Sequence, residues 1–276
     1  LKAIETFEHA LPDLNRRAPG LLPQALLSLL NDAPPNLTLH ALGRTEVMMA
    51  GRTITNNEWQ TQISRDMLFC LLAHPDGLTK DEIGEMFWPD ATLSEVKTRF
   101  KNAIYRLRNA LSQQVVLFNA ELYRFNWSLT YEYDVEQFLQ KAAQGDSFSQ
   151  AADRIVAYQE ALQLYRGDYL CDVDAAWVLV ERERLHRIFI DTTLTLGQLQ
   201  LEAQEFRSAL ETCQRALADD PCLEDAHRLA MRIYAAMGNR AAVARQFAQC
   251  RQALLDEIDA PPSPQTEELY TLLMRS

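Results

Sequence analysis

The apolar spacing of residues 96–111 is the feature that most constrains how this chain can fold. At 100° per residue, six apolar side chains fall on one stripe: Val96, Phe100, Ala103, Ile104, Leu107 and Leu111. The opposite side carries polar groups: Thr98, Lys101, Asn102, Tyr105 and Asn109. The stretch is therefore predicted to be an amphipathic helix. One side packs on a core, and the other is free to contact a partner.

This stretch also reverses the sign of the chain's charge. Between residues 94 and 112 a single acid, Glu95, is opposed by five basic residues, a net charge of +4: Lys97, Arg99, Lys101, Arg106 and Arg108. The whole chain of 276 residues carries a net charge of −11. Such a local reversal indicates a polyanionic partner. Taken alone, the helix is equally consistent with the solvated face of an ordinary domain.

Two short helices are predicted before the basic one. The first begins at Ser64 as its cap and stops before Pro75. The second opens with a capping box formed by Thr79 and Glu82, and Pro89 closes it.

Strands are predicted on both sides of these helices. Residues 115–118 and 122–125 are rich in β-branched and aromatic residues and flank a short turn, which predicts a hairpin. Upstream, apolar and polar residues alternate in residues 37–42 and 45–49, and a turn at Gly51 leads into residues 52–54. These three segments are predicted to form a small sheet. A sheet, two helices, a basic helix and a hairpin are the parts of a winged helix, whose third helix enters the DNA major groove.

The predicted winged helix divides the polar residues into two roles. Lys101, Asn102 and Tyr105 are central candidates for base edges, because Asn pairs with adenine and Lys reaches guanine acceptors. Thr98 and Asn109 share that face. The candidates for phosphate contacts are three residues on the flanks of the helix and one on the hairpin: Lys97, Arg106, Arg108 and Arg124. For Arg99 and Arg106, ion pairs with acids of the second helix are an alternative, and for Arg124, simple solvation.

Residues 37–127 resemble the OmpR/PhoB-type winged helix of the SARP-type bacterial transcriptional activators. Three pieces carry the resemblance: residues 73–77 (Ala-His-Pro-Asp-Gly), 87–90 (Phe-Trp-Pro-Asp) and 106–111 (Arg-Leu-Arg-Asn-Ala-Leu). The resemblance implies that the loop 89–92 lies where related proteins contact RNA polymerase. Residue chemistry alone reads the same loop as a helix-entry turn capped by Thr92 or Ser94.

From Asp134 onward the apolar residues recur at helical spacing, which predicts a stack of helices. The positions of Phe206, Ala209, Gly238 and Phe247 suggest an imperfect tetratricopeptide (TPR) period, and hence TPR-like helical pairs. This region resembles the bacterial transcriptional activator domain of the same family in residues 164–170, 177–185 and 220–228.

Charge separates the two halves. Residues 36–130 contain 10 basic and 10 acidic residues, whereas residues 134–276 contain 14 basic and 23 acidic ones. The predicted fold is mainly α: a winged helix-turn-helix domain at 36–130 with a small sheet and a wing hairpin, followed by an all-α TPR-like domain at 134–276. Tyr131 and Tyr133 are expected to pack the domains together or to finish the last strand of the wing. Residues 1–35 are expected to form a helical segment or a linker from an upstream input domain. By the family resemblance, that domain would be a two-component receiver or an ATPase module.

Catalysis is not expected. The five cysteines form no Cys-x-x-Cys pair, the five histidines show no metal spacing, and the phosphate-binding and nucleophile-elbow motifs are missing. No cofactor and no metal are therefore expected. The odd number of cysteines, several of them in apolar helical runs, indicates a reduced, cytoplasmic location. The sequence has no run of 18 apolar residues and no signal-peptide pattern, so a soluble protein without a membrane partner is expected.

The sequence thus predicts a DNA-binding transcriptional regulator, an activator by resemblance, with promoter DNA as its partner. Its acidic helical domain is expected to form a homodimer, to receive a signal or to contact RNA polymerase. Two alternatives stay open, a TPR-like protein-binding scaffold and a ligand-responsive signalling adaptor.

Overall fold

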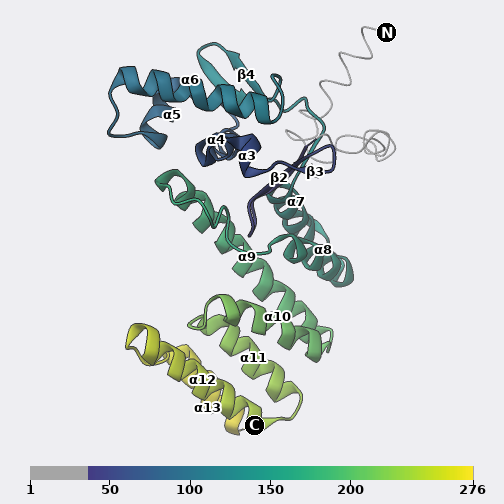
Figure 1. Ribbon diagram of the computed structural model, residues 1–276. Coiled ribbons are helices and arrows are strands. Elements are labelled where there is room, and N and C mark those ends of the chain that lie inside the picture. The colour runs from purple at the N-terminus through teal and green to yellow at the C-terminus, as the bar shows by residue number, and fades with distance from the viewer. Residues whose placement is uncertain (1–36, 276) are drawn as a thin grey trace. The chain divides into compact units, whose positions relative to one another are not determined.

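The computed structural model describes residues 37–275 (Figure 1). The expected segment 1–35 lies outside the described residues. The first part of the chain contains the following elements: β1 (Leu37–His40), β2 (Glu46–Met49), β3 (Arg52–Thr53), α3 (Asn56–Trp59), α4 (Gln62–Ala73), α5 (Lys80–Phe87), α6 (Leu93–Ala110), β4 (Val116–Asn119), β5 (Leu122–Phe125) and β6 (Tyr131–Tyr133). The rest is helical: α7 (Asp134–Ser147), α8 (Ala151–Leu164), α9 (Ala176–Glu202), α10 (Phe206–Asp219), α11 (Glu224–Ala236), α12 (Arg240–Ile258) and α13 (Pro264–Arg275). The predicted fold class is confirmed.

The described residues divide into two compact units. Within the described range, the first comprises residues 37–135 together with Arg166–Arg184, and the second comprises Glu136–Tyr165 and residues 185–275. This division differs from the two contiguous segments 36–130 and 134–276 expected from the sequence, because a stretch far along the chain belongs to the first unit.

The first unit has a four-stranded sheet in the order β3-β2-β1-β6. Its neighbouring strands are antiparallel except for β1 and β6, which pair in parallel with Leu37 opposite Tyr131 and Leu39 opposite Tyr133. Tyr131 and Tyr133 therefore belong to the edge strand β6 of this sheet. The sequence predicted instead that they pack the two domains together or finish the last strand of the wing. The wing is a separate hairpin of β4 and β5.

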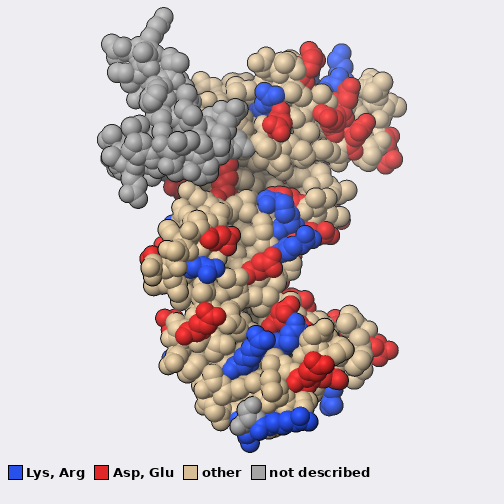
Figure 2. Space-filling view, turned by 180° about the vertical axis from the view of Figure 1, so that it is seen from behind, with Lys and Arg blue, Asp and Glu red and all other residues tan. Residues whose placement is uncertain are grey.

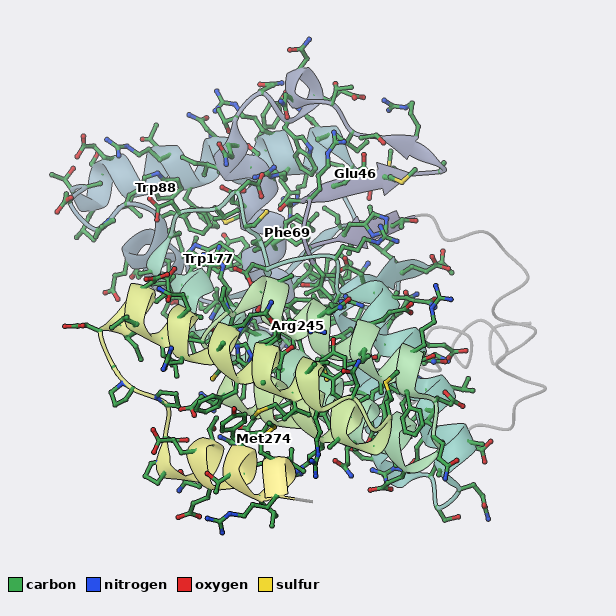
Figure 3. The ribbon with its side chains drawn as sticks, turned by 90° about the horizontal axis from the view of Figure 1, so that it is seen from below. Glu46, Phe69, Trp88, Trp177, Arg245 and Met274 are labelled. Atoms are coloured by element: carbon green, nitrogen blue, oxygen red, sulfur yellow. The ribbon has the colours of Figure 1, made fainter. Side chains whose placement is uncertain are left out.

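Helix α4 is the centre of the first unit, because its residues from Met67 to Leu72 are all buried. One of them, Phe69, is labelled in Figure 3. It packs against α6 and β5. The helix begins at Gln62, and its cap is Thr61, three residues before the expected cap Ser64. Ser64 is fully buried in the first turn, and its hydroxyl lies 2.8 Å from that of Thr61. The prediction of Ser64 as the cap was therefore wrong.

The end of the sheet is held by Asp134, a buried residue at the start of α7. Its carboxylate accepts hydrogen bonds from the backbone N–H of Ala41 at 2.9 Å and of Leu42 at 3.0 Å. The imidazole of His40 lies 3.7 Å from the same carboxylate. Burial nevertheless raises the pKa of Asp134 above its usual range.

The segment Arg166–Arg184 joins the first unit through backbone and side-chain bonds. The N–H of Leu170 donates to the carbonyl of Ala41 at 2.8 Å, and Gly43 donates to Asp168 at 3.1 Å. The guanidinium of Arg65 donates to the carboxylate of Asp172 at 2.7 Å. Near the end of α5, the ring of Phe87 lies 5.8 Å from that of Trp88 and 5.9 Å from that of Trp177, the second residue of α9 (Figure 3). The segment is therefore part of the first unit's packing.

In the second unit, α9, α10 and α11 share a buried cluster: Ala209, Cys213, Leu229, Ala230 and Ile233, with Leu194, Leu201, Phe206 and Leu210 packed around it. Gly197 permits this packing, since a Cβ there would lie 2.8 Å from Leu229. Helix α12 packs on α11 and α13, and the rings of Phe247 and Tyr270 stack at 4.2 Å. These TPR-like helical pairs confirm the second half of the fold prediction. Across residues 37–275, every helix is too short or too polar to cross a lipid bilayer.

Three helices of the first unit begin with the same capping box, formed by Thr55 and Glu58, Thr79 and Glu82, and Thr92 and Glu95. In each, the glutamate accepts hydrogen bonds from the backbone N–H and the hydroxyl of the threonine. Those bonds, led by the backbone one, lower the pKa of all three glutamates, that of Glu58 to about 2.

The capping boxes predict a specific loss of stability in acid. A carboxylate whose pKa is lower in the folded state stabilises the fold above its unfolded pKa of about 4.3, and this stabilisation is lost as the pH falls towards the folded value. We expect a triple variant with Glu58→Gln, Glu82→Gln and Glu95→Gln to lose less stability between pH 5 and pH 2.5 than the wild type, because Gln keeps the box without titrating. Urea unfolding followed by circular dichroism at several pH values measures this. Equal losses in both proteins would contradict it.

Candidate nucleic-acid interface

Helix α6 has the two sides that its sequence predicts. Every residue of the predicted apolar stripe is buried: Val96, Phe100, Ala103, Ile104, Leu107 and Leu111. On the other side Thr98, Lys101, Asn102, Tyr105 and Asn109 are all exposed, and Tyr105 is 63% exposed. The helix begins with the Thr92 capping box, so Thr92 and not Ser94 is the cap.

Close contact with α5 holds α6 in place. Gly84 of α5 faces Val96, and a Cβ at Gly84 would lie 2.6 Å from a methyl group of Val96. The wing packs against the stripe one turn further on, where the ring of Tyr123 on β5 lies edge-on against Phe100 at 4.7 Å. We call the exposed polar side of α6 the polar ridge; it consists of Thr98, Lys101, Asn102, Tyr105 and Asn109. The packing of α5 and the wing against the buried stripe holds this ridge in place, as a surface that reads base edges requires.

The flanks of the polar ridge differ in their partners. On one flank Lys97 is exposed and forms no ion pair with any residue described. Arg108, on the same flank, is half-buried and donates from Nη2 to the carbonyl of Val116 on β4 at 2.9 Å. Arg108 thus ties α6 to the wing, a contact that its sequence position did not indicate.

The opposite flank carries Arg99 and Arg106. Nη2 of Arg99 lies 3.4 Å from the carboxylate of Glu95, one turn earlier on the same helix. Nε of Arg106 donates to the amide oxygen of Gln60, at the end of α3, at 3.2 Å. The expected alternative, ion pairs of these arginines with acids of α5, was therefore wrong, because nearer acceptors lie on α6 itself and on α3.

Arg124, the wing candidate, is fixed at the base of the hairpin. Its Nε donates to the carbonyl of Asp76 at 2.7 Å. Gly77 makes room for it, since a Cβ at Gly77 would lie 2.5 Å from Cγ of Arg124, and the φ angle of Gly77 is +89°. The Pro-Asp-Gly turn singled out in the sequence thus binds this arginine: Asp76 supplies the acceptor and Gly77 leaves space for the side chain.

Acidic side chains of the first unit lie largely away from the ridge. Helix α5 carries Asp81, Glu82 and Glu85, and Figure 2 shows acidic groups gathered at the end of this unit that carries α5. Sequence reasoning missed one exposed apolar side chain at the start of α6, that of Leu93, which is 83% exposed. Leu93 has the angular position of the buried stripe, so its exposure could not be predicted from spacing.

Among residues 37–275, no group of three or more His, Cys, Asp or Glu side chains is placed to hold a metal ion. All five cysteines are free thiols. Burial raises the pKa of Cys70 and of Cys213 to about 12.

A winged helix whose basic helix α6 is exposed, joined to TPR-like helices, is the architecture of a bacterial transcriptional regulator. Residues 133–273 match the family model described as "Bacterial transcriptional activator domain". The chain belongs to this family, and the resemblance to the SARP-type activators is confirmed.

Solved structures also match the chain, among them the following two. EmbR of Mycobacterium tuberculosis, described in complex with a low affinity phosphopeptide, matches over 88% of this chain with a TM-score of 0.70 and 16% identity. The chain covers 66% of that protein, slightly less than two thirds of its length. This likeness concerns the fold, and it includes both the winged helix and the helical unit. The C-terminal TPR-containing domain of a putative FK506-binding protein of Plasmodium falciparum matches over 51% of this chain and 89% of its own, with 16% identity and a TM-score of 0.38, too low to bear on the fold. Among curated proteins, none matches the chain.

Proposed function

We propose that the protein is a sequence-specific DNA-binding transcriptional activator that docks α6 in the major groove of promoter DNA. One observation carries the proposal: the apolar stripe of α6 is buried, whereas the basic polar ridge beside it is exposed. A helix about 10–12 Å across fits a major groove about 12 Å wide. Such a protein works in the cytoplasm, where bacterial DNA lies.

In the proposed complex the ridge and its flanks act differently. Lys101, Asn102 and Tyr105 point away from the core and would meet base edges, with Thr98 and Asn109 beside them. Phosphates would be met by Lys97 and Arg108 on one flank, Arg106 on the other, and Arg124 at the wing.

The second unit is proposed to serve protein partners. Its surplus of acids repels DNA, so homodimer formation, contact with RNA polymerase and receipt of a signal, as from a two-component system, suit it better.

The test begins with the purified chain and a library of random duplexes. We expect selection to enrich one sequence, and electrophoretic shifts at two salt concentrations to give tighter binding to it than to a scrambled duplex. The salt series separates a DNA-binding protein from a protein-binding scaffold, since only the former loses affinity steeply as salt rises. Absence of binding to any duplex at low salt would refute the proposal.

Lys97 is the cleanest probe of a phosphate contact, because it has no partner among the described residues. Lys97→Ala is expected to weaken binding to selected and scrambled DNA alike, and to reduce the slope of log affinity against log salt by about 0.9. Fluorescence anisotropy across a salt series measures both quantities. Lys80→Ala, which removes a lysine paired with Asp81 on α5, is the control and should leave the slope unchanged. An unchanged slope in Lys97→Ala would remove the residue from the interface.

The loop 89–92 is proposed to contact RNA polymerase, as the family resemblance implies. We extend this contact to Leu93, the residue that follows the loop, because of its exposure. An apolar side chain that is 83% exposed can anchor such a contact. We expect Leu93→Ala to leave DNA affinity intact and to lower transcription from a promoter carrying the selected site by about fivefold, from the loss of about 1 kcal/mol of contact. Reconstituted transcription with a bacterial polymerase measures this. Equal transcription by both proteins would exclude Leu93 from the contact.

A further inference from the structure

Arg99 and Arg106 lie on the same flank of α6, two helical turns apart, yet they are held in different ways. Arg99 faces the carboxylate of Glu95, which offsets its charge. Arg106 donates from Nε to Gln60, whose amide oxygen is neutral. Because Nε of a guanidinium can only donate, the amide must present its oxygen to it. Arg106 is therefore fixed in orientation and keeps its full positive charge.

The same arrangement recurs at the other arginines proposed to contact phosphate. Arg108 is held by the carbonyl of Val116 and Arg124 by the carbonyl of Asp76. Elsewhere in the first unit both kinds of acceptor occur. Carboxylates hold Arg52 (Glu58) and Arg65 (Asp66 and Asp172), whereas Arg182 donates to backbone carbonyls, among them that of Tyr169 at 2.8 Å. A neutral acceptor is thus common to the three arginines proposed to contact phosphate, although it is not confined to them.

The backbone does not explain why residue 60 is a glutamine. Gln60 ends α3 with φ of 60°, in the left-handed region, where glycine is the residue of lowest cost. Its side chain is exposed, so it adds nothing to the core. An exposed, non-glycine residue in a strained conformation indicates a role for its side chain.

We propose that Gln60 is a positioning residue for DNA binding, which orients Arg106 towards a phosphate without neutralising it. This inference rests on the proposed function. The amide occupies Nε and leaves both Nη groups of Arg106 to donate to a phosphate. Because the side chain is already ordered in the free protein, binding does not have to immobilise it.

The test is a double-mutant cycle between Gln60→Gly and Arg106→Ala, read by anisotropy on selected and scrambled duplexes. Gln60→Gly removes the amide and relieves the backbone, so the thermal midpoint should stay the same or rise. DNA affinity should nevertheless fall about 2- to 10-fold on both duplexes, the cost of ordering one side chain. In the Arg106→Ala background, Gln60→Gly should have no further effect on affinity.

Gln60→Glu is the second probe, since a carboxylate would hold Arg106 in place but neutralise it. We expect lower affinity and a salt slope reduced by about 0.9, as in Arg106→Ala. Arg99→Ala is the matched control and should change the slope less, because Glu95 already offsets that charge.

Each outcome decides between the two proposals. If the wild type binds no duplex, the proposed function fails. If the wild type binds and Arg106→Ala weakens it, but Gln60→Gly has no effect or acts equally in both backgrounds, only the role of Gln60 is overturned. A fall in thermal midpoint that matches the loss of affinity would make Gln60 merely structural, which also overturns it.

Discussion

The double variant Asn102→Ala with Tyr105→Ala should lose most of the preference of the protein for its selected site. Both side chains stand exposed on the ridge of α6, clear of the core. Each base contact discriminates by about 1–3 kcal/mol, so the two together predict a loss of specificity of at least about 30-fold. The ratio of dissociation constants for selected and scrambled duplexes at one salt concentration measures it.

Affinity for scrambled DNA should change little in this variant, because the phosphate contacts on the flanks remain. Gln249→Ala, a polar substitution on the exposed side of α12, is the control and should leave the ratio unchanged. Equal losses on both duplexes would reassign Asn102 and Tyr105 to the DNA backbone.

Asp134→Ala is expected to have the largest effect on stability. Without the carboxylate, the N–H groups of Ala41 and Leu42 lose their acceptor in a buried place, at a cost of about 1–3 kcal/mol each. We therefore expect the free energy of unfolding to fall by about 3–5 kcal/mol in urea titrations. Glu132→Ala, two residues earlier and exposed, should stay within about 0.5 kcal/mol of the wild type.

Asp134→Asn refines this prediction, because it retains one acceptor oxygen and should lie between the other two proteins. If Asp134→Ala proved as stable as Glu132→Ala, the carboxylate would not be what holds the end of the sheet.

Local signals in the sequence were sufficient to predict the helices and the hairpin that form the candidate interface. The capping box of Thr79 and Glu82 placed the start of α5 correctly. The stripe of α6 was predicted residue by residue, because burial on one side of a helix follows from its period. The turn between β4 and β5 was also predicted, although Ala120 and Glu121 adopt positive φ values there without a glycine.

Contacts between residues distant in sequence could not be predicted. The pairing of β6 with β1 joins Tyr131 to Leu37, and no local pattern encodes it. The neutral acceptors of the arginines are equally distant, since Gln60 and Arg106 lie 46 residues apart. The exposed ridge of the site could therefore be predicted from the sequence. The hydrogen-bond partners of the arginines on its flanks could be found only in the structure.

The membership of Arg166–Arg184 in the first unit has a consequence for synthesis of the protein. A ribosome that has released residue 135 has not yet supplied every part of this unit, because Leu170 and Arg182 emerge later. The first unit therefore cannot complete its fold until translation has passed residue 184. Gene fusions that splice the two halves at a single junction would likewise divide one folding unit.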